Sequence, residues 1–392
     1  MTGKFKQHIR PLLARDRDEE HRAATQLELL FDLVVVIAIA AIARGLSHQI
    51  AAGHDAIAIV QFLAAFFAVW WPWNLFTWFA SSFDNDDAAY RINVMVMMFG
   101  TMLVAANIPA FFHEGALTYG FIGYMVLRIA FAILWMRAGL ANSHLRTTAT
   151  RYALGQIILQ AGWAIVIFAF EPDSVLFFVS FALVAAAELF VPWYAEKAAN
   201  THWHRQHIME RFGLLNIIVL GEVLLSSTIA LEITFEDGFK TSLLLLSLCG
   251  TILAFSMWWL YFCEEEHLES TEFNRTFIWS YGHFIVFAAG SSVGAGLEVA
   301  VEAIAEAHGA SEDLGVAAFA ITIPIACYVA GLWLVRDRYV LGDVRGAFLL
   351  FFAVLIALTG FLPYSPIPAT VLLVVCLLVR LQIEKRSHPA EG

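Results

Sequence analysis

The sequence predicts an all-α membrane protein whose chain crosses the bilayer about twelve times. Of its 392 residues, 60% are hydrophobic and 15% are charged, and the mean hydropathy is +0.71. Soluble domains are less apolar, with about a quarter of their residues charged. The apolar residues form long unbroken runs, which favours helices over a membrane β-barrel. The net charge of −11 comes from a few acidic loops, so no nucleic-acid partner is predicted.

Twelve apolar runs are each near the length of about 20 residues that a helix needs to cross the hydrocarbon core. The runs cover residues 27–50, 56–80, 91–112, 117–137, 152–170, 174–195, 208–231, 241–263, 276–302, 314–335, 345–363 and 366–383. Only PYSPIP separates the last two, which predicts a tight turn between antiparallel helices. The four cysteines lie in or beside these runs without C-x-x-C spacing, so neither a disulfide framework nor a zinc site is predicted.

Lysine and arginine residues gather on one side of this topology. All but three of the 23 fall in the N-terminal tail, in or near the connections after even-numbered runs, or at the C-terminal end. The exceptions are Arg44 and Arg128, which lie within runs, and Lys240, which lies in an otherwise acidic connection. Loops rich in lysine and arginine stay in the cytoplasm. Both termini are therefore predicted to be cytoplasmic.

The beginnings of runs 1 and 7 resemble each other. LELLFDLVVVIAIA compares with IMERFGLLNIIVLGE, which aligns Glu28 with Glu210. An arginine follows each at nearly the same spacing, at Arg91 and Arg275. This similarity predicts two parallel six-helix repeats, a plan common in transporters. The repeats are residues 1–197, with a cytoplasmic tail, and 198–392, and runs 1 and 7 would occupy equivalent central positions. The alternative, that hydrophobic helices resemble one another by composition alone, stays open.

Three stretches of the chain resemble the signatures of a known family. ELLFDLVVVIAI, followed by LSH, resembles the opening signature of the bacterial low-temperature-requirement A (LtrA) family. ERFGLLNIIVLGE and YGHFIVFAAGSSVGAGLE are similar to its second and third signatures, in the same order. Leu30, Asn216 and Val223 depart from the commoner residues without removing a charged position. The resemblance implies a multi-pass protein of the bacterial inner membrane, named for growth at low temperature. It does not determine a molecular activity.

A fainter resemblance links the chain to the lysosomal potassium channels, which are also built from two six-helix repeats. In that family an arginine and a Phe-Ser-Asp motif open the pore-lining first helix of each repeat. Arg22, Phe31 and Asp32 follow here in a comparable order, whereas the second half has Leu214 or Asn216 near the position of the aspartate. The resemblance implies a shared architecture only.

Glu28 and Asp32 stand at the start of the first run, in a segment that otherwise reads as membrane helix. Four residues apart, they share one helix face about 6 Å apart along it. One interpretation is that they are interfacial carboxylates favoured by the helix dipole. The other is that Asp32 lines the cytoplasmic mouth of a pathway. Arg44 lies about 18 Å further along the helix, near the outer leaflet, where its side chain can snorkel.

Deeper ionisable residues predict either a pathway or a polar core. They are Arg128 in run 4, Glu188 in run 6, Glu222 in run 7 and Glu298 in run 9. An unpaired charge at the midplane costs several kcal/mol on most estimates, so Arg128 is expected to pair with Glu188 or Glu222. The acids outnumber the bases, which predicts a hydrated or proton-carrying path shared by Asp32 and Glu222. The alternative is a satisfied core that only holds helices together.

The histidines give weaker predictions. His283 opens run 9 and is a candidate proton carrier, but it lies about 22 Å from Glu298 along the same helix. His202, His204 and His207 in THWHRQH have a spacing that could hold a transition metal. Interfacial histidines beside a tryptophan are commoner than such a site. No metal site and no cofactor are therefore predicted.

These observations leave two hypotheses from different classes. The first is a secondary transporter or channel for protons, cations or a small solute, with a pathway through intramembrane carboxylates. Its candidate residues are Glu28, Asp32, Arg44, Arg128, Glu188, Glu210, Arg211, Glu222, His283 and Glu298. The alternative is a membrane scaffold or intramembrane enzyme with a structural charged core. Catalytic signatures such as G-x-S-x-G and H-E-x-x-H are absent, so an enzyme is not the leading hypothesis. The expected partner is the lipid bilayer, and a homo-oligomer is compatible with the sequence.

Overall fold

The computed structural model describes residues 10–15, 23–83, 87–172, 174–236, 240–264, 273–306, 315–342 and 346–387. Within these ranges, eleven helices are long and apolar enough to cross a membrane, and a further apolar helix, Phe348–Phe361, is shorter. The protein is therefore an all-α polytopic membrane protein, as the sequence predicts. Such a chain must be helical in lipid because only helices or closed barrels pair all their backbone polar groups there.

The chain divides into two compact units. Unit 1 is Met1–Ile42 with Val60–Phe212, and unit 2 is Ala43–Ile59 with Gly213–Gly392. Three helices contribute residues to both units: α1 (Gln26–Ala51), α2 (Asp55–Phe83) and α7 (Arg205–Glu236). The predicted parallel repeats, with a boundary at residue 197, stay a prediction.

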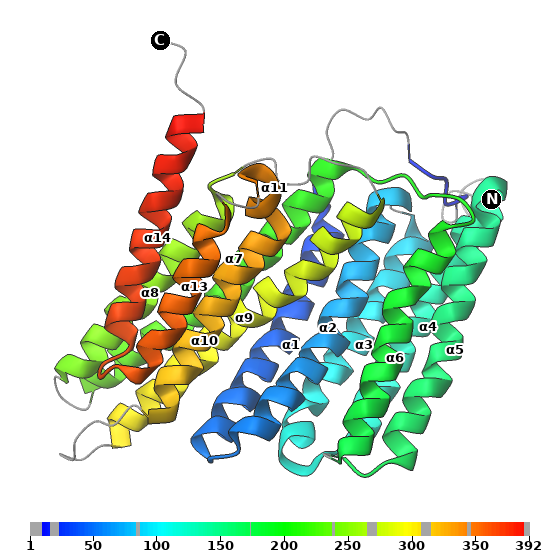
Figure 1. Ribbon diagram of the computed structural model, residues 1–392. Helices are drawn as coiled ribbons and strands as arrows, with labels where there is room; N and C mark the ends of the chain where they lie inside the picture. Colours follow the sequence, from blue (N-terminus) through cyan, green and yellow to red (C-terminus); the bar gives the residue numbers. More distant parts are fainter. Residues whose placement is uncertain are drawn as a thin grey trace. The chain divides into compact units, whose positions relative to one another are not determined.

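Unit 1 contains four consecutive helices in which each packs against the next (Figure 1). They are α3 (Ala88–Glu114), α4 (Thr118–Ala141), α5 (Arg146–Ala169) and α6 (Val175–Glu196), with the short helix η2 (Ser143–Leu145) before α5. Gly115 ends α3 with φ 65°, a left-handed conformation that favours glycine. Short connections of this kind make neighbouring helices antiparallel.

Asp87 caps α3 and joins it to the segment before α1. Its carboxylate accepts the backbone N–H groups of Tyr90 at 2.6 Å and Arg10 at 2.7 Å, and it pairs with Arg137 at 2.8 Å. Burial opposes ionisation of this carboxyl, but the three donors outweigh burial and lower the pKa of Asp87. The negative charge also complements the N-terminal end of the helix dipole.

Unit 2 is built around α9, with α10 packed along it and α14 packed against α8 and α13 (Figure 1). Its helices are α8 (Thr241–Phe262), α9 (Phe273–Glu306), α10 (Gly315–Leu332), the π-helical turn η3 (Trp333–Asp337), α11 (Arg338–Val340), α13 (Phe348–Leu358), η4 (Thr359–Phe361) and α14 (Pro366–Ser387). The predicted tight turn lies between η4 and α14, where Tyr364 has φ 54°.

Close packing of α9 against α10 depends on Gly296. A Cβ atom at this position would lie 2.2 Å from the backbone oxygen of Ala320. We expect Gly296→Ala to lower the free energy of unfolding by about 1–3 kcal/mol, the usual cost of overpacking. Gly221 in α7 is the matched control, because a Cβ there would meet nothing within 4 Å.

Thermal unfolding of the purified protein in detergent measures this difference. Gly221→Ala is expected to be neutral or to stabilise by up to about 1 kcal/mol, since alanine favours the helix. Equal unfolding temperatures for Gly296→Ala and the parent protein would contradict the proposed crossing.

Candidate functional site

Glu28 begins α1 in a reciprocal capping arrangement. Its Oε2 accepts the backbone N–H of Thr25 at 2.7 Å, and its own N–H donates to Thr25 Oγ1 at 3.3 Å. This is a capping box, whose signature is the T-x-x-E in TQLE. The other oxygen, Oε1, lies 3.1 Å from His207 Nε2 and 3.5 Å from Arg211 Nη1. Glu28 therefore both starts α1 and joins it to the first turns of α7.

Asp32, one turn further along α1, is held by two other helices of unit 1. Trp73 Nε1 donates to Asp32 Oδ1 at 2.7 Å, and Arg211 Nε donates to Oδ2 at 3.0 Å. A second guanidinium N–H of Arg211 pairs with Oδ1, which makes the contact bidentate. All three residues are buried. Asp32 lies in unit 1 and Glu222 in unit 2, so the predicted path shared by the two stays a prediction.

The placement of Arg211 corrects the sequence interpretation. The positive-inside pattern counted it with the cytoplasmic cations near the start of the seventh run, but it lies within a membrane-length helix and is fully buried. It is stable there because Asp32 and Glu28 both face it. Glu210, the preceding residue, is exposed and accepts the N–H of Ala24 at 3.1 Å. The repeat-matched acids Glu28 and Glu210 therefore both bind the chain just before α1.

Arg128 and Glu188 form a second buried ion pair in unit 1, after Asp32 and Arg211. Their side chains are ion-paired and neither is exposed. Trp71 Nε1 donates to Glu188 Oε2 at 3.1 Å and Trp163 Nε1 donates to Oε1 at 3.2 Å. The Tyr124 ring lies 5.5 Å from the guanidinium carbon of Arg128. Of the two partners that the sequence allows for Arg128, the structure selects Glu188.

An apolar cavity of about 90 Å³ lies beside this pair. Ala68, Phe111, Tyr124, Trp163 and Phe181 are among its lining residues. Its lining is almost wholly apolar, and apolar surfaces of this kind hold water poorly. The cavity therefore does not offer the water or polar ligands that a hydrated ion needs.

His283 is buried in unit 2 and is bound through both ring nitrogens. Nδ1–H donates to the carbonyl of Trp279, one turn earlier, at 2.7 Å, and Nε2 lies 3.1 Å from the Tyr261 hydroxyl. His283 and Glu298 lie on the single helix α9, as the sequence predicts, at opposite parts of its length. This environment holds His283 as a packing residue of α8 and α9.

Sequence reasoning missed a buried charged cluster at the end of α10. Asp337 accepts from Arg336 Nε at 3.0 Å and from Arg380 Nε at 2.7 Å. Arg336 Nη1 also donates to the carbonyls of Leu260 and Tyr261 at 2.7 and 2.9 Å, which satisfies the C-terminal end of α8.

The cluster was missed because VRDR follows the tenth apolar run and looks like a cytoplasmic loop. The helix extends beyond the apolar run that ends near residue 335 and continues through Val340 by way of the π-helical turn. The charge pattern assigned Arg336 to a connection and Arg380 to the C-terminal end, but the structure buries both. The sequence signal for this cluster was Asp337, which directly follows Arg336 in VRDR.

Five further charged side chains lie in unit 2, and none of them is fully buried. Arg44 and His48 are exposed on α1, whereas Glu222, Glu298 and Glu302 are half-buried on α7 and α9. Glu222 lies close enough to Arg44 and Glu298 for electrostatic interaction with both. All five belong to helices of membrane-spanning length and composition. We call these five residues the accessible charged group.

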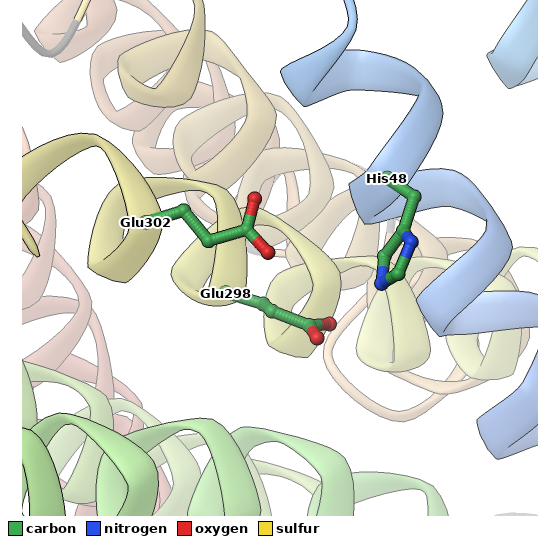
Figure 2. A group of neighbouring side chains, drawn as sticks. All are labelled: His48, Glu298 and Glu302. Atoms are coloured by element: carbon green, nitrogen blue, oxygen red, sulfur yellow. The ribbon is translucent and has the colours of Figure 1, made fainter. Parts of the chain in front are cut away.

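His48 and Glu302 are the members that sequence reasoning missed. The signal was their spacing, because His48 follows Arg44, and Glu302 follows Glu298, by four residues on one helix face. Figure 2 shows the two carboxylates of α9 and the imidazole of α1 around a common space. One ligand atom from each of these three residues lies within 4.8 Å of the others. In the part of the chain that the structure describes, no other trio of histidine, cysteine or acidic residues meets this criterion.

The chain matches the model of the family described as "Bacterial low temperature requirement A protein (LtrA)" over residues 23–382. The chain belongs to the LtrA family. A relative from Rhizobium meliloti (strain 1021), described as "Uncharacterized protein RA0937", is 27% identical over 300 residues that cover 70% of each chain. No solved structure matches the chain significantly.

In this LtrA protein the intramembrane charges fall into two classes. The sealed groups are Asp32 with Arg211, Arg128 with Glu188, and Asp337 with its two arginines. In each of them opposite charges meet at hydrogen-bonding distance inside the protein. The accessible charged group is different, because it retains solvent or lipid exposure within membrane-length helices. The two classes call for different explanations.

Proposed function

We propose that this LtrA protein moves a cation across the membrane, as a secondary transporter or channel, along the accessible charged group of unit 2. The observation that carries the proposal is the half-buried state of Glu222, Glu298 and Glu302 on helices of membrane-spanning length. An ionised side chain facing lipid costs several kcal/mol on most estimates. Intramembrane charges of this kind usually line water-filled cavities or ion pathways.

The sign of the charge favours a cation. The group contains three carboxylates against one guanidinium, Arg44, and one imidazole, His48. A surplus of acid attracts cations and repels anions at close range. Acidic side chains along a pore are also one way in which cation channels select their ions.

The sealed groups support the alternative hypothesis, a scaffold with a structural charged core, for their own parts of the protein. Matched pairs such as Arg128 with Glu188 hold helices together without any exchangeable charge. They do not account for the exposed ionisable residues of α1 or the half-buried glutamates of α7 and α9. The transport proposal therefore rests on unit 2 and leaves the pairs of unit 1 structural.

We place this protein in the bacterial inner membrane with both termini in the cytoplasm. The support is the lysine and arginine bias without Arg211, Arg336 and Arg380, which are buried in helices. The homo-oligomeric state stays open. A second copy that covers the accessible charged group would be one way to keep it away from lipid.

The test is flux into proteoliposomes that contain the purified protein, under imposed gradients of protons and of monovalent or divalent cations. Glu222→Gln and Glu298→Gln are expected to reduce uptake by roughly tenfold or more, the ratio produced by a loss of about 1.4 kcal/mol in cation binding. Glu232→Gln is the matched control, because this glutamate is exposed on α7 about ten residues further along.

Each variant is first compared with the parent protein in yield and thermal unfolding. Flux through Glu232→Gln at the parental level, with loss in the two test variants, supports the proposal. Uptake no greater than in empty liposomes for every gradient, or unchanged uptake in both test variants, would refute it and favour the scaffold.

A further inference from the structure

Three side chains of the accessible charged group converge on one point. His48 lies in the last turn of α1, and Glu298 and Glu302 lie one turn apart on α9. Figure 2 shows that the two carboxylates and the imidazole point into the same space from two different helices. Ligand atoms from all three lie within 4.8 Å of one another.

We propose that His48, Glu298 and Glu302 bind a divalent transition-metal cation of the zinc or manganese type. The inference rests on the proposed function and names its substrate class. Tetrahedral ligands about 2.1 Å from a metal lie roughly 3.4 Å apart, so side-chain rotations that move each atom by about an ångström close the site. Three protein ligands leave a coordination position for water, as in sites from which a ligand exchanges.

The donor set selects the class of ion. An imidazole nitrogen suits zinc, iron, nickel or copper, whereas magnesium and calcium take oxygen ligands. Two carboxylates add charge that matches a divalent ion, and carboxylate ligands also suit manganese. They also select against copper(I), which prefers sulfur ligands.

A second observation shows that one ligand is already oriented. The hydroxyl of Ser47, a buried residue of α1, lies 2.8 Å from Glu298 Oε2 and 2.9 Å from the carbonyl oxygen of Arg44, and it can donate its single proton to the carboxylate. Hydrogen bonds of this kind orient metal-binding carboxylates and leave the other oxygen to the ion. Arg44, one turn before His48, forms no ion pair with Glu298 in the part of the chain that the structure describes. Among the described residues, no lysine or arginine forms an ion pair with Glu298.

Metal binding to the purified full-length protein tests the inference independently of flux. The protein is stripped of metal and titrated with Co²⁺, whose visible absorption reports nitrogen and oxygen ligands, and then with Zn²⁺ as competitor. We expect one Co²⁺ per chain, displaced by Zn²⁺ and retained in excess Mg²⁺. His48→Ala and Glu302→Gln are expected to weaken binding by tenfold or more.

His54→Ala is the matched control, because His54 is exposed six residues further on, in the turn before α2. It should bind Co²⁺ like the parent protein. Absence of stoichiometric binding, or equal affinities for His48→Ala and His54→Ala, would overturn the site.

The outcomes separate this inference from the transport proposal. Binding that depends on His48, without flux of any cation, would support the metal site and refute transport. Flux of protons or monovalent cations without stoichiometric Co²⁺ binding would refute the metal site and leave transport standing.

Discussion

Replacing Arg211 with methionine is expected to lower the free energy of unfolding by about 3–5 kcal/mol, because it leaves a buried charge without its partner. Arg211 binds Asp32 through two N–H groups and also faces Glu28. Without the guanidinium, Asp32 keeps the indole N–H of Trp73 as its hydrogen-bond donor. Thermal unfolding and yield of the purified protein in detergent measure the effect.

Two further variants make the result interpretable. Arg146→Met removes an exposed arginine at the start of α5 and should stay within about 0.5 kcal/mol of the parent protein. The double variant Asp32→Asn with Arg211→Met should recover part of the loss, since no uncompensated charge remains. A single variant Arg211→Met as stable as Arg146→Met would show that Asp32 has another way to be satisfied.

Asp337→Asn is expected to have a comparably large effect in unit 2. The carboxylate of Asp337 accepts from both Arg336 and Arg380, so its neutralisation leaves two buried guanidinium groups close together. Breaking a buried pair from one side costs about 3–5 kcal/mol. The same change should loosen the end of α8, whose carbonyls bind Arg336.

Glu264→Gln is the control for the second prediction. Glu264 also pairs with Arg380, at 2.8 Å, but its side chain is 22% exposed. Arg380 keeps Asp337 as its buried partner in this variant, so Glu264→Gln should cost less stability than Asp337→Asn. If Asp337→Asn is no less stable than Glu264→Gln, then the buried cluster does not stabilise the end of α10.

Much of the fold could be predicted because its signals are local. A helix in lipid must satisfy its own backbone and be about 20 apolar residues long, so the runs mark the helices directly. Neighbouring residues in the sequence likewise encode the capping box at Thr25 and Glu28 and the turn before α14. Where the local signal was mixed, the prediction failed. Arg336 and Asp337 follow an apolar run, and sequence alone placed them in a loop.

The candidate site was only partly predictable. Arg44, Glu222 and Glu298 stand out in sequence because each is a charge within an apolar run. His48 and Glu302 do not, since each lies near the end of a run, where polar residues are ordinary. Their importance comes from the meeting of α1 and α9, which are separated by more than 200 residues.

The sequence by itself determined that this protein is a bundle of membrane helices and which of its residues are costly to bury. Only the tertiary structure decided which charge meets which. Arg128 could pair with Glu188 or Glu222 by sequence, and Asp32 had no assigned cation until Arg211 was found beside it. The reason is physical. Spans are selected by the transfer of each segment into lipid, one at a time, whereas an ion pair depends on atoms a few ångströms apart on helices distant in the chain.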